Sequence, residues 1–190
     1  MEAGWSTLYK VVFLDRDGLI NQQAPEHDYI KSWTEFRFLP GVAEAIHQLN
    51  EAGYLALVVT NQRGVARGLI SMTTVDEIHK FMCRELDQNG AHIEKVYVCP
   101  HEEGTCNCRK PDIGLFLQAE QDFKIDKKHS WMVGDSDSDV KAGQNYGVRT
   151  IRTTSLPLAA SQILGGVRKR NRSDVDDFIY DGVEHFCSER

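Results

Sequence analysis

Residues 11–18 read VVFLDRDG, an apolar, β-branched run that stops at two aspartates spaced two apart. Such a run is typical of a buried strand in a parallel sheet, and Gly18 lets the chain turn sharply after it. Ligands of open α/β sheets bind outside the carboxyl ends of the strands. The stretch therefore predicts an α/β fold with Asp15 and Asp17 at the site of chemistry. Taken alone, an Asp-x-Asp pair is more often a strand-end turn with solvated acids.

Three later stretches favour the chemical interpretation. Residues 58–61, VVTN, end a second strand in a hydroxyl residue, and residues 132–135, MVGD, end another strand in an acid. Between them, residues 108–111, CRKP, place a lysine just before a predicted helix. In this order the four stretches resemble the four motifs of the haloacid dehalogenase-like phosphatases, over roughly residues 8–152. Asp137 and Asp139 follow the last motif and are expected to be acids at a helix N-terminus, where the dipole favours them, although one could orient the water ligands of a metal.

The hydrophobic pattern predicts alternating strands and helices. Strands are expected at 9–14, 54–59, 93–98, 130–133 and 148–152. Helices are expected from 42 to Gly53, from a capping box at 74–77 to Gly90, at 113–123 and at 136–146. This alternation predicts a doubly wound, Rossmann-like parallel sheet with helices on both faces. Loops are expected at 18–39 and 61–72, a solvated basic loop at 168–172 within the patternless stretch 153–173, an edge strand at 177–180 and a last helical turn at 183–187.

The segments between the motifs are filled by these elements, so we expect a capless fold and a single domain over residues 1–190. Hydrophobic residues make up 41% of the chain, which is usual for a globular protein. The net charge of −6 argues against general nucleic-acid binding. No apolar run of about 18 residues predicts a membrane span, and the first residues lack the pattern of a signal peptide. The expectation is a monomer in the cytoplasm, where the five cysteines are reduced thiols or metal ligands.

The resemblance implies roles for the residues of the four motifs. It implies that Asp15 attacks phosphorus and forms an aspartyl-phosphate, and that Asp17 exchanges protons with the leaving oxygen and with the attacking water. Magnesium would be held by the side chains of Asp15 and Asp135 and by the backbone carbonyl of Asp17. Thr60 and Lys110 would bind the phosphoryl oxygens and offset their negative charge.

Residues 99–108 carry three cysteines and a histidine within ten positions. Three thiolates and an imidazole form an ordinary structural zinc set, which predicts a small zinc-binding loop; the alternative is two buried cysteines beside an exposed histidine. A zinc ion here would fix the loop that presents Lys110. The expected ligands are Cys99, His101, Cys106 and Cys108. The other cysteines, Cys83 and Cys187, fall in helical patterns and are expected in the core.

The pattern Cys-x-His followed by Cys-x-Cys-Arg-Lys-Pro is similar to one branch of the superfamily, which holds heptose-bisphosphate phosphatases and histidinol-phosphatases. The run TNQRGVARG at 60–68 resembles the heptose enzymes, whereas histidinol-phosphatases tend to have an acid at the position of Arg63. Arginine grips phosphate well, and a sugar bisphosphate carries a second dianion. Candidate substrate contacts are Asn61, Gln62, Arg63, Arg67, Arg109, His27 and Tyr29.

This resemblance predicts a magnesium-dependent phosphomonoester hydrolase that removes the 7-phosphate of D-glycero-D-manno-heptose 1,7-bisphosphate. A histidinol-phosphatase with the same residues is the nearest alternative. A catalytically idle, zinc-stabilised binding module is a third, against which the complete set of motif residues argues.

Overall fold

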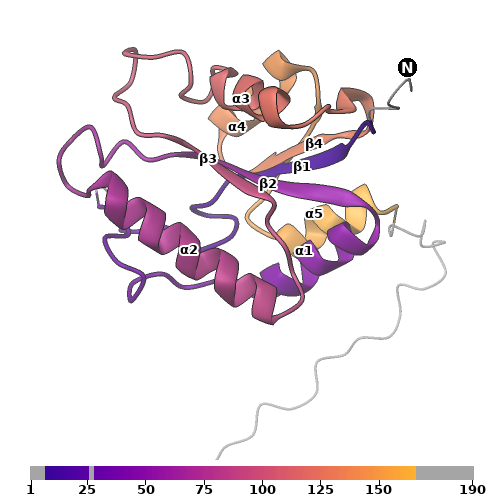
Figure 1. The fold of residues 1–190 in the computed structure, drawn as a ribbon, viewed down its shortest axis with the longest axis horizontal. Coiled ribbons are helices and arrows are strands. Elements are labelled where there is room, and N and C mark those ends of the chain that lie inside the picture. Colours follow the sequence, from indigo (N-terminus) through magenta and orange to yellow (C-terminus); the bar gives the residue numbers. More distant parts are fainter. Residues whose placement is uncertain (1–6, 26–27, 166–190) are drawn as a thin grey trace, which may run out of the picture.

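The structure, a computed structural model, describes residues 7–25 and 28–165. Five parallel strands form one sheet in the order β3-β2-β1-β4-β5, with helices on both faces (Figure 1). The strands are β1 (Lys10–Leu14), β2 (Tyr54–Asn61), β3 (Lys95–Cys99), β4 (Trp131–Gly134) and β5 (Arg149–Arg152). The helices are α1 (Val42–Glu51), α2 (Met72–Gln88), α3 (Gly114–Asp122), α4 (Asp137–Tyr146), α5 (Leu156–Ile163) and the 3₁₀ helix η1 (Lys127–His129). The predicted fold class is confirmed.

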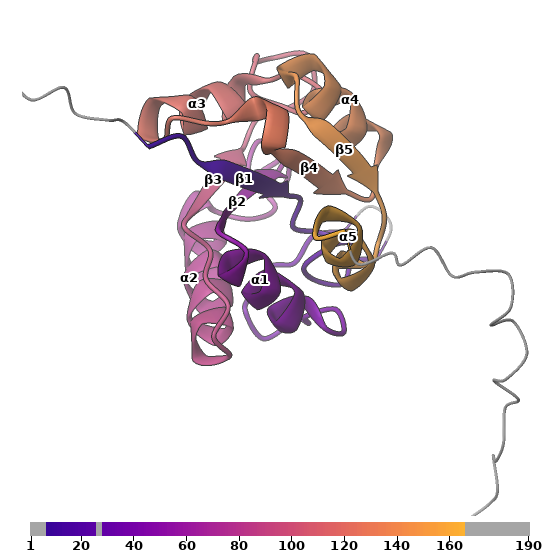
Figure 2. The same cartoon turned by 90° about the vertical axis from the view of Figure 1, so that its right-hand side faces the viewer.

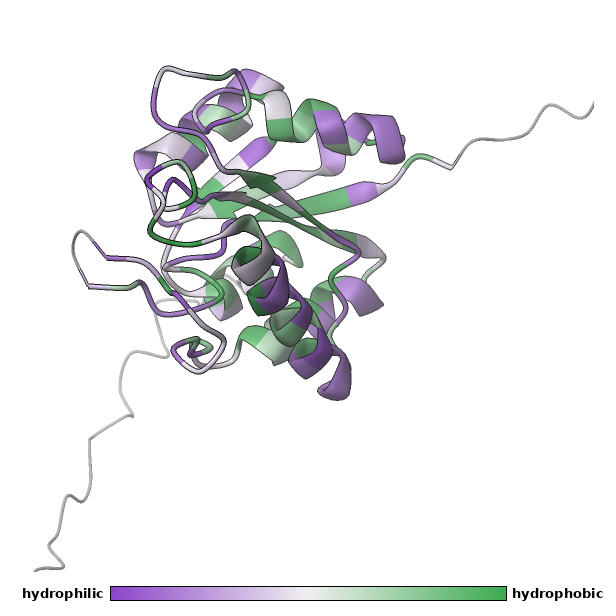
Figure 3. Cartoon of the chain, turned by 60° about the vertical axis from the view of Figure 1, so that its left-hand side comes forward, coloured by the Kyte–Doolittle hydropathy of each residue, from purple (hydrophilic) through white to green (hydrophobic). Residues whose placement is uncertain are grey.

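The central strand β1 separates two hydrophobic cores. Val12 and Leu14 point into the core shared with α1, α2 and α5, whereas Val11 and Phe13 point into the core shared with α3 and α4. Figure 2 shows these two groups of helices on opposite sides of the sheet, and Figure 3 shows the apolar strands between helices with hydrophilic outer surfaces. Because successive side chains of a strand alternate between faces, a continuous apolar run is what burial on both faces requires.

The direction of chain winding reverses between β1 and β4. The helices α1 and α2 cover one face and α3 and α4 the other, and β1 pairs directly with β4 through Leu14 and Val133. The pairing continues one residue further, since the backbone N–H of Asp15 donates to the Val133 carbonyl at 2.9 Å. Such a reversal point is where open α/β sheets bind ligands. The fold therefore brings the acids that follow β1 and β4 side by side.

The connections at this edge of the sheet are loops. The segment from β1 to α1 runs over residues 15–41, that from β2 to α2 over 62–71, and that from β3 to α3 over 100–113. None of the described residues in these connections forms a helix or a named strand, so the described chain has no cap domain, as expected. In the same part of the chain, no helix is long and apolar enough to cross a membrane.

Two predicted boundaries were wrong. The capping box expected at 74–77 is absent, because α2 begins three residues earlier: the Ser71 hydroxyl accepts from the backbone N–H of Thr74 at 3.0 Å and caps the helix. Strand β3 begins at Lys95 and not at Ile93. The apolar residues at helical spacing from which this helix was predicted are Val75, Ile78, Met82 and Leu86, and all four are buried.

Helix α5 lies in the stretch 153–173, for which the sequence showed no pattern. Its residues Leu156, Ala159 and Ala160 are buried at helical spacing and pack in the same core as α1. The pattern was present but short, and the glycines and basic residues that follow obscured it. The predictions for 168–172, 177–180 and 183–187, including a buried Cys187, lie outside the described residues.

The start of α2 can be tested by two substitutions. Replacing the N-cap, Ser71→Ala, leaves the Thr74 N–H without its acceptor and should lower the free energy of unfolding by about 1 kcal/mol, measured by urea denaturation. The matched control Glu77→Ala removes the acid of the capping box that the sequence predicted, and should change stability by no more than about 0.5 kcal/mol. A larger loss of stability in Glu77→Ala than in Ser71→Ala would instead indicate that Thr74 caps the helix.

Candidate active site

The motif residues predicted from the sequence meet at the carboxyl edge of the sheet. Asp15 follows β1, Thr60 lies near the end of β2, Asp135 follows β4, and Lys110 comes from the loop between β3 and α3. Lys110 and Thr60 are almost completely buried. Residues up to 120 positions apart in the chain are thus gathered in one place by the parallel strands.

The ammonium of Lys110 lies between two carboxylates. Its Nζ is 2.7 Å from Asp15 Oδ1 and 2.6 Å from Asp139 Oδ1, and it donates to the Val59 carbonyl at 2.7 Å. Burial alone would lower the pKa of Lys110, but the two carboxylates outweigh it and raise that pKa. Lysine is therefore a fixed cation beside Asp15, as the sequence predicted.

The side chain of Asn61 holds the backbone of Lys110 in place. Its Oδ1 accepts from the Lys110 N–H at 3.0 Å, and its Nδ2 donates to the Lys110 carbonyl at 3.1 Å. Asn61 was predicted as a substrate contact, and the structure gives it a positioning contact that the sequence did not indicate. A reciprocal pair of this kind fixes both the position and the orientation of the Lys110 backbone.

The carboxylate of Asp17 is surrounded by donors. Asn21 Nδ2 donates to its Oδ1 at 2.9 Å, Gln62 Nε2 donates to its Oδ2 at 2.8 Å, and the guanidinium of Arg16 contacts both oxygens. Gln62 also donates to the Thr60 hydroxyl at 2.9 Å. Burial would raise the pKa of Asp17, but the Arg16 charge and the three side-chain donors outweigh it and lower the pKa. The side chain is held in one orientation beside the site.

Three carboxylates could hold a divalent cation. Oxygens of Asp15, Asp135 and Asp139 lie within 4.8 Å of one another, and Lys110 is the cation that offsets part of their charge. Burial raises the pKa of Asp15 to about 7. Lys110 opposes this rise, and Asp139 adds to it. Clustered hard oxygen ligands with partial exposure suit magnesium, so the residues present fit the ion that the sequence implied. The predicted backbone ligand, the carbonyl of Asp17, stays a prediction.

Two glycines leave room for this cluster. A Cβ at Gly18, where φ is +88°, would collide with the Asp135 carboxylate and with Gln23, and a Cβ at Gly134 would collide with Asp139. Gln23 Nε2 donates to Asp135 Oδ2 at 2.5 Å. The glycines of the first and last motifs are thus required by the close approach of carboxylates, and in Gly18 also by the backbone conformation.

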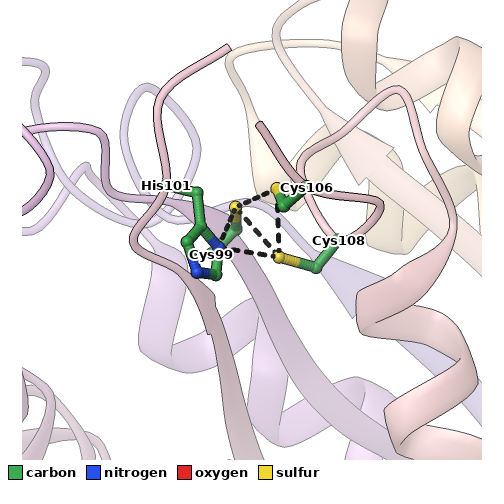
Figure 4. Close-up of side chains that lie close together, drawn as sticks. All are labelled: Cys99, His101, Cys106 and Cys108. Carbon is green, nitrogen blue, oxygen red and sulfur yellow. Dashed lines mark hydrogen bonds between the residues drawn. The ribbon is translucent and has the colours of Figure 1, made fainter. Parts of the chain in front are cut away.

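The four predicted zinc ligands converge (Figure 4). Their ligand atoms lie within 4.8 Å of one another; the three Sγ–Sγ distances are 3.2, 3.4 and 3.6 Å, and the His101 Nδ1 lies 3.3 Å from Cys108 Sγ and 3.7 Å from Cys99 Sγ. Tetrahedral zinc with Zn–S bonds of about 2.3 Å separates its sulfurs by about 3.8 Å, so a small outward movement of the thiols would accommodate the ion. The thiols are free and not joined as disulfides. The donor set and its geometry fit a four-coordinate zinc ion.

Acids lie beside the arginines that were predicted to contact the substrate. Glu102, from the cysteine loop, accepts from Arg67 Nε at 3.0 Å and lies 3.2 Å from Arg63 Nη1, while Glu103 lies 3.8 Å from Arg63. A hydrogen bond with Tyr29 raises the pKa of Arg63 and brings that side chain to the loop after β1. The structure therefore joins Arg63, Arg67 and Tyr29 at one rim, and His27 lies outside the described residues.

Two hollows flank the site. One of about 270 Å³ is lined by Asp17, Gln23, Tyr29, Asn61 and Gln62, among others. The second, of about 210 Å³, is lined by Asn61, Arg109, Lys110 and Ser138, among others. Arg109 lines the second hollow, and its Nη1, which is buried, has no hydrogen-bond partner among the described residues. A guanidinium that lines a hollow is suited to bind an anion.

Sequence reasoning did not assign several residues of this site, among them Asn21 and Gln23. Asp139 was expected to be a helix N-terminal acid or to orient the water ligands of a metal; it forms a capping box with Ser136, and its other oxygen pairs with Lys110. Arg16 was not singled out, and neither was His79, which lies buried on α2 and contacts Arg16. The signal for His79 was a histidine within the apolar face of a predicted helix.

Comparison with known proteins agrees with this geometry. The family model described as HAD-hydrolase-like matches residues 107–155. The chain is 42% identical over 149 residues to D-glycero-beta-D-manno-heptose-1,7-bisphosphate 7-phosphatase of Haemophilus ducreyi, covering 74% of this chain and 80% of the relative. It is 37% identical over 142 residues to D-glycero-alpha-D-manno-heptose-1,7-bisphosphate 7-phosphatase of Campylobacter jejuni, covering 75% and 80%.

A solved structure is also similar. D,D-heptose 1,7-bisphosphate phosphatase from B. bronchiseptica, complexed with magnesium and phosphate, gives a TM-score of 0.71 at 31% identity and covers 83% of this chain and 99% of that one. The chain therefore belongs to the haloacid dehalogenase-like hydrolases. Within that superfamily it is a phosphatase, of the family that includes the H. ducreyi and C. jejuni enzymes. The resemblance seen in the motifs is confirmed.

The buried histidine beside the site predicts an acid-sensitive fold. Burial and the Arg16 charge lower the pKa of His79 from 6.5 to about 3, against a smaller opposite effect of Asp17. Below pH 6.5 the unfolded chain therefore binds a proton that the folded chain does not. The free energy of unfolding decreases as the pH is lowered. Between pH 7.5 and 5.5 the parent should lose about 1.4 kcal/mol more than His79→Gln in urea denaturation. The control Lys80→Gln should behave as the parent; equal losses in parent and His79→Gln would contradict the prediction.

Proposed function

We propose that this protein is a magnesium-dependent phosphomonoester hydrolase that removes the 7-phosphate of a D-glycero-D-manno-heptose 1,7-bisphosphate. The observation that carries the proposal is the Asp15 carboxylate, held at the sheet edge by the buried Lys110 cation and flanked by Asp17. The names of the relatives supply the substrate class. A carboxylate can attack a phosphate ester only where positive charge offsets the repulsion between them, and this site places a cation at the nucleophile.

In the first half-reaction, one Asp15 oxygen attacks phosphorus and forms the aspartyl-phosphate. The bond between phosphorus and the C7 oxygen of the sugar breaks, and Asp17 donates a proton to the leaving oxygen. Asp17 must be protonated for this step, and the approach of a dianionic phosphate raises the pKa of a neighbouring carboxylate. The sugar leaves as the 1-phosphate with a free 7-hydroxyl.

In the second half-reaction, water attacks the phosphorus of the aspartyl-phosphate while Asp17 accepts its proton. The acyl phosphate bond breaks, inorganic phosphate leaves and the Asp15 carboxylate is restored. Magnesium held by Asp15, Asp135 and the Asp17 carbonyl would supply positive charge to the phosphoryl oxygens and orient them. Lys110 and the Thr60 hydroxyl stabilise the same oxygens from the side of β2.

We further propose that the second phosphate of the substrate binds at the rim formed by Arg63, Arg67 and Arg109. The position of Arg109 in the lining of the hollow beside Lys110 supports this most directly. Gln62 and Tyr29 line the neighbouring hollow and are proposed to contact the sugar, with His27 from the same loop. The protein is expected to act as a cytoplasmic monomer of one domain, residues 1–190, on this small molecule and not on nucleic acid.

One observation favours the alternative substrate, histidinol phosphate. Glu102 and Glu103 stand at the same rim as Arg63, and carboxylates there would suit the cationic amine of that substrate. Glu102 already pairs with two arginines, so the rim is close to neutral and not acidic. The balance of charges leaves the sugar bisphosphate as the better fit.

Phosphate release from a substrate panel tests the function. The parent should hydrolyse a heptose 1,7-bisphosphate, in one or both anomeric forms, with a higher kcat/KM than histidinol phosphate, fructose bisphosphate or p-nitrophenyl phosphate. Asp15→Asn, which keeps the shape and removes the nucleophile, should reduce turnover of every substrate to background. Arg63→Gln removes a charged donor worth about 1.5–3 kcal/mol, so kcat/KM for the bisphosphate should fall about 10- to 100-fold.

The matched control for Arg63→Gln is Arg84→Gln, an exposed arginine on α2 that pairs with Glu85. Arg84→Gln should leave all rates unchanged, and Arg63→Gln should change turnover of p-nitrophenyl phosphate, which has no second phosphate, by less than about threefold. A higher kcat/KM for histidinol phosphate, or an unchanged rate on the bisphosphate in Arg63→Gln, would contradict the assignment.

We also propose that zinc is bound by Cys99, His101, Cys106 and Cys108 and that it fixes the loop leading to Lys110. Four protein ligands close the coordination sphere, so the ion would be structural. The support is the convergence of the four ligand atoms and the position of Cys108 two residues before Lys110. A fixed loop lowers the entropy lost when Lys110 and Arg109 bind phosphate.

Elemental analysis of the purified protein should find one zinc ion per chain. Cys106→Ser removes one ligand, so it should lose the ion and a large part of its stability, well beyond the ~1 kcal/mol of an average substitution. Cys83→Ser, at a cysteine on α2 outside the cluster, should keep both zinc and thermal stability near those of the parent. A zinc-free parent, or a Cys106→Ser protein as stable as the parent, would remove the structural role.

A further inference from the structure

The guanidinium of Arg16 is buried between the active-site loop and helix α2. The residue is 1% exposed and is one of the largest fully buried side chains of the described chain. A buried charge is tolerated only where it is paired and its donors are satisfied. The partners of Arg16 therefore show what its burial achieves.

On one side, Arg16 grips the carboxylate of the next residue. Its Nη2 donates to Asp17 Oδ1 and Oδ2, both at 2.9 Å, and its Nε lies 3.2 Å from Oδ1. Asn21 and Gln62 bind the same two oxygens from other directions. The planar fork of arginine fixes the plane of a carboxylate, which a lysine ammonium does not do.

On the other side, Arg16 donates to His79. The distance from Arg16 Nη1 to His79 Nε2 is 3.0 Å. Since a guanidinium has only donors, Nε2 must be the unprotonated, accepting nitrogen of a neutral imidazole. The lowered pKa of His79 agrees with this tautomer. Helix α2 holds the acceptor in place, because Val75, Ile78 and Met82 on the same face are buried in the core.

We propose that Arg16 and His79 are positioning residues for the proton transfers of Asp17. The imidazole nitrogen fixes the rotation of the guanidinium, and the guanidinium fork orients the carboxylate toward the leaving oxygen and the attacking water. The hydrogen bonds from α2 to Asp17 thus reach the reaction through Arg16, which lines the hollow beside Asp17, whereas His79 lines neither hollow. This inference rests on the role of Asp17 in the proposed function.

The dependence of the rate on the leaving group separates this role from a general loss of structure. A sugar alkoxide needs a proton as it leaves, whereas p-nitrophenolate leaves readily without one. Single-turnover experiments with enzyme in excess, which follow release of the alcohol or phenol, isolate the first half-reaction. The acyl-phosphate hydrolysis common to both substrates then does not enter the measured rate.

The variant His79→Met removes the acceptor and puts an apolar side chain that suits a helix in its place. It should slow release of the heptose monophosphate about 10- to 100-fold, because small misplacements of catalytic groups have effects of that size, and slow release of p-nitrophenol less than about threefold. His79→Gln, whose amide oxygen can accept from Arg16, should recover most of the difference. Arg16→Lys keeps the charge and loses the planar pair of donors. It should also slow release of the heptose monophosphate more than release of p-nitrophenol, and it provides the test if His79→Met does not fold.

The matched control is Ile78→Val, which loosens the same helix, has no polar group that could bind Arg16, and should affect both substrates equally and slightly. Equal losses on the two substrates in His79→Met and Arg16→Lys, or no loss on either, would overturn the inference. If the parent does not hydrolyse a heptose bisphosphate, the proposed substrate fails separately. The same comparison then uses histidinol phosphate or another alkyl phosphate that the parent does hydrolyse.

Discussion

The burial of the Lys110 ammonium among carboxylates is the interaction on which the arrangement of the site depends. A cation enclosed in this way must lie within contact distance of opposite charge, and here Asp15 and Asp139 provide it from two different segments. The loop after β3 is thereby tied to the end of β1 and to the first turn of α4. Gly134 contributes by having no side chain, since any Cβ there would displace Asp139.

The end of β2 connects the two halves of the site. The Val59 carbonyl and the Asn61 side chain hold Lys110, whereas Gln62 turns to the other side and binds Asp17. Because these residues follow one another at the end of a single strand, a shift of β2 would disturb the contacts with Lys110 and the contact with Asp17 together. Asp15, the proposed nucleophile, follows β1, which is the direct neighbour of β2 in the sheet, and it contacts the Lys110 ammonium.

The strands, the order of the motifs and the four converging thiol and imidazole ligands could be predicted, because they depend on local composition and spacing. Contacts between side chains on separate elements could not. His79 reaches Arg16 only because of how α2 is rotated against the sheet, and no spacing in the chain records that rotation. Asp139 was expected either as an acid at a helix N-terminus, where it does lie, or as a group that orients the waters of a metal, and neither expectation indicated that its second oxygen meets Lys110. The start of α2 was misplaced because two serine or threonine caps compete within three residues.

The bridge formed by Glu102 makes anion binding at the rim an exchange reaction. Glu102 occupies Arg63 Nη1 and Arg67 Nε, so an incoming phosphate that takes these donors releases a carboxylate to water. The number of ion pairs is then nearly conserved, and added salt weakens the starting and the final state alike. The cost of releasing Glu102 is the same for every incoming anion, so it lowers the affinity of the rim for all of them by the same factor and leaves the preference for a dianion to the arginines.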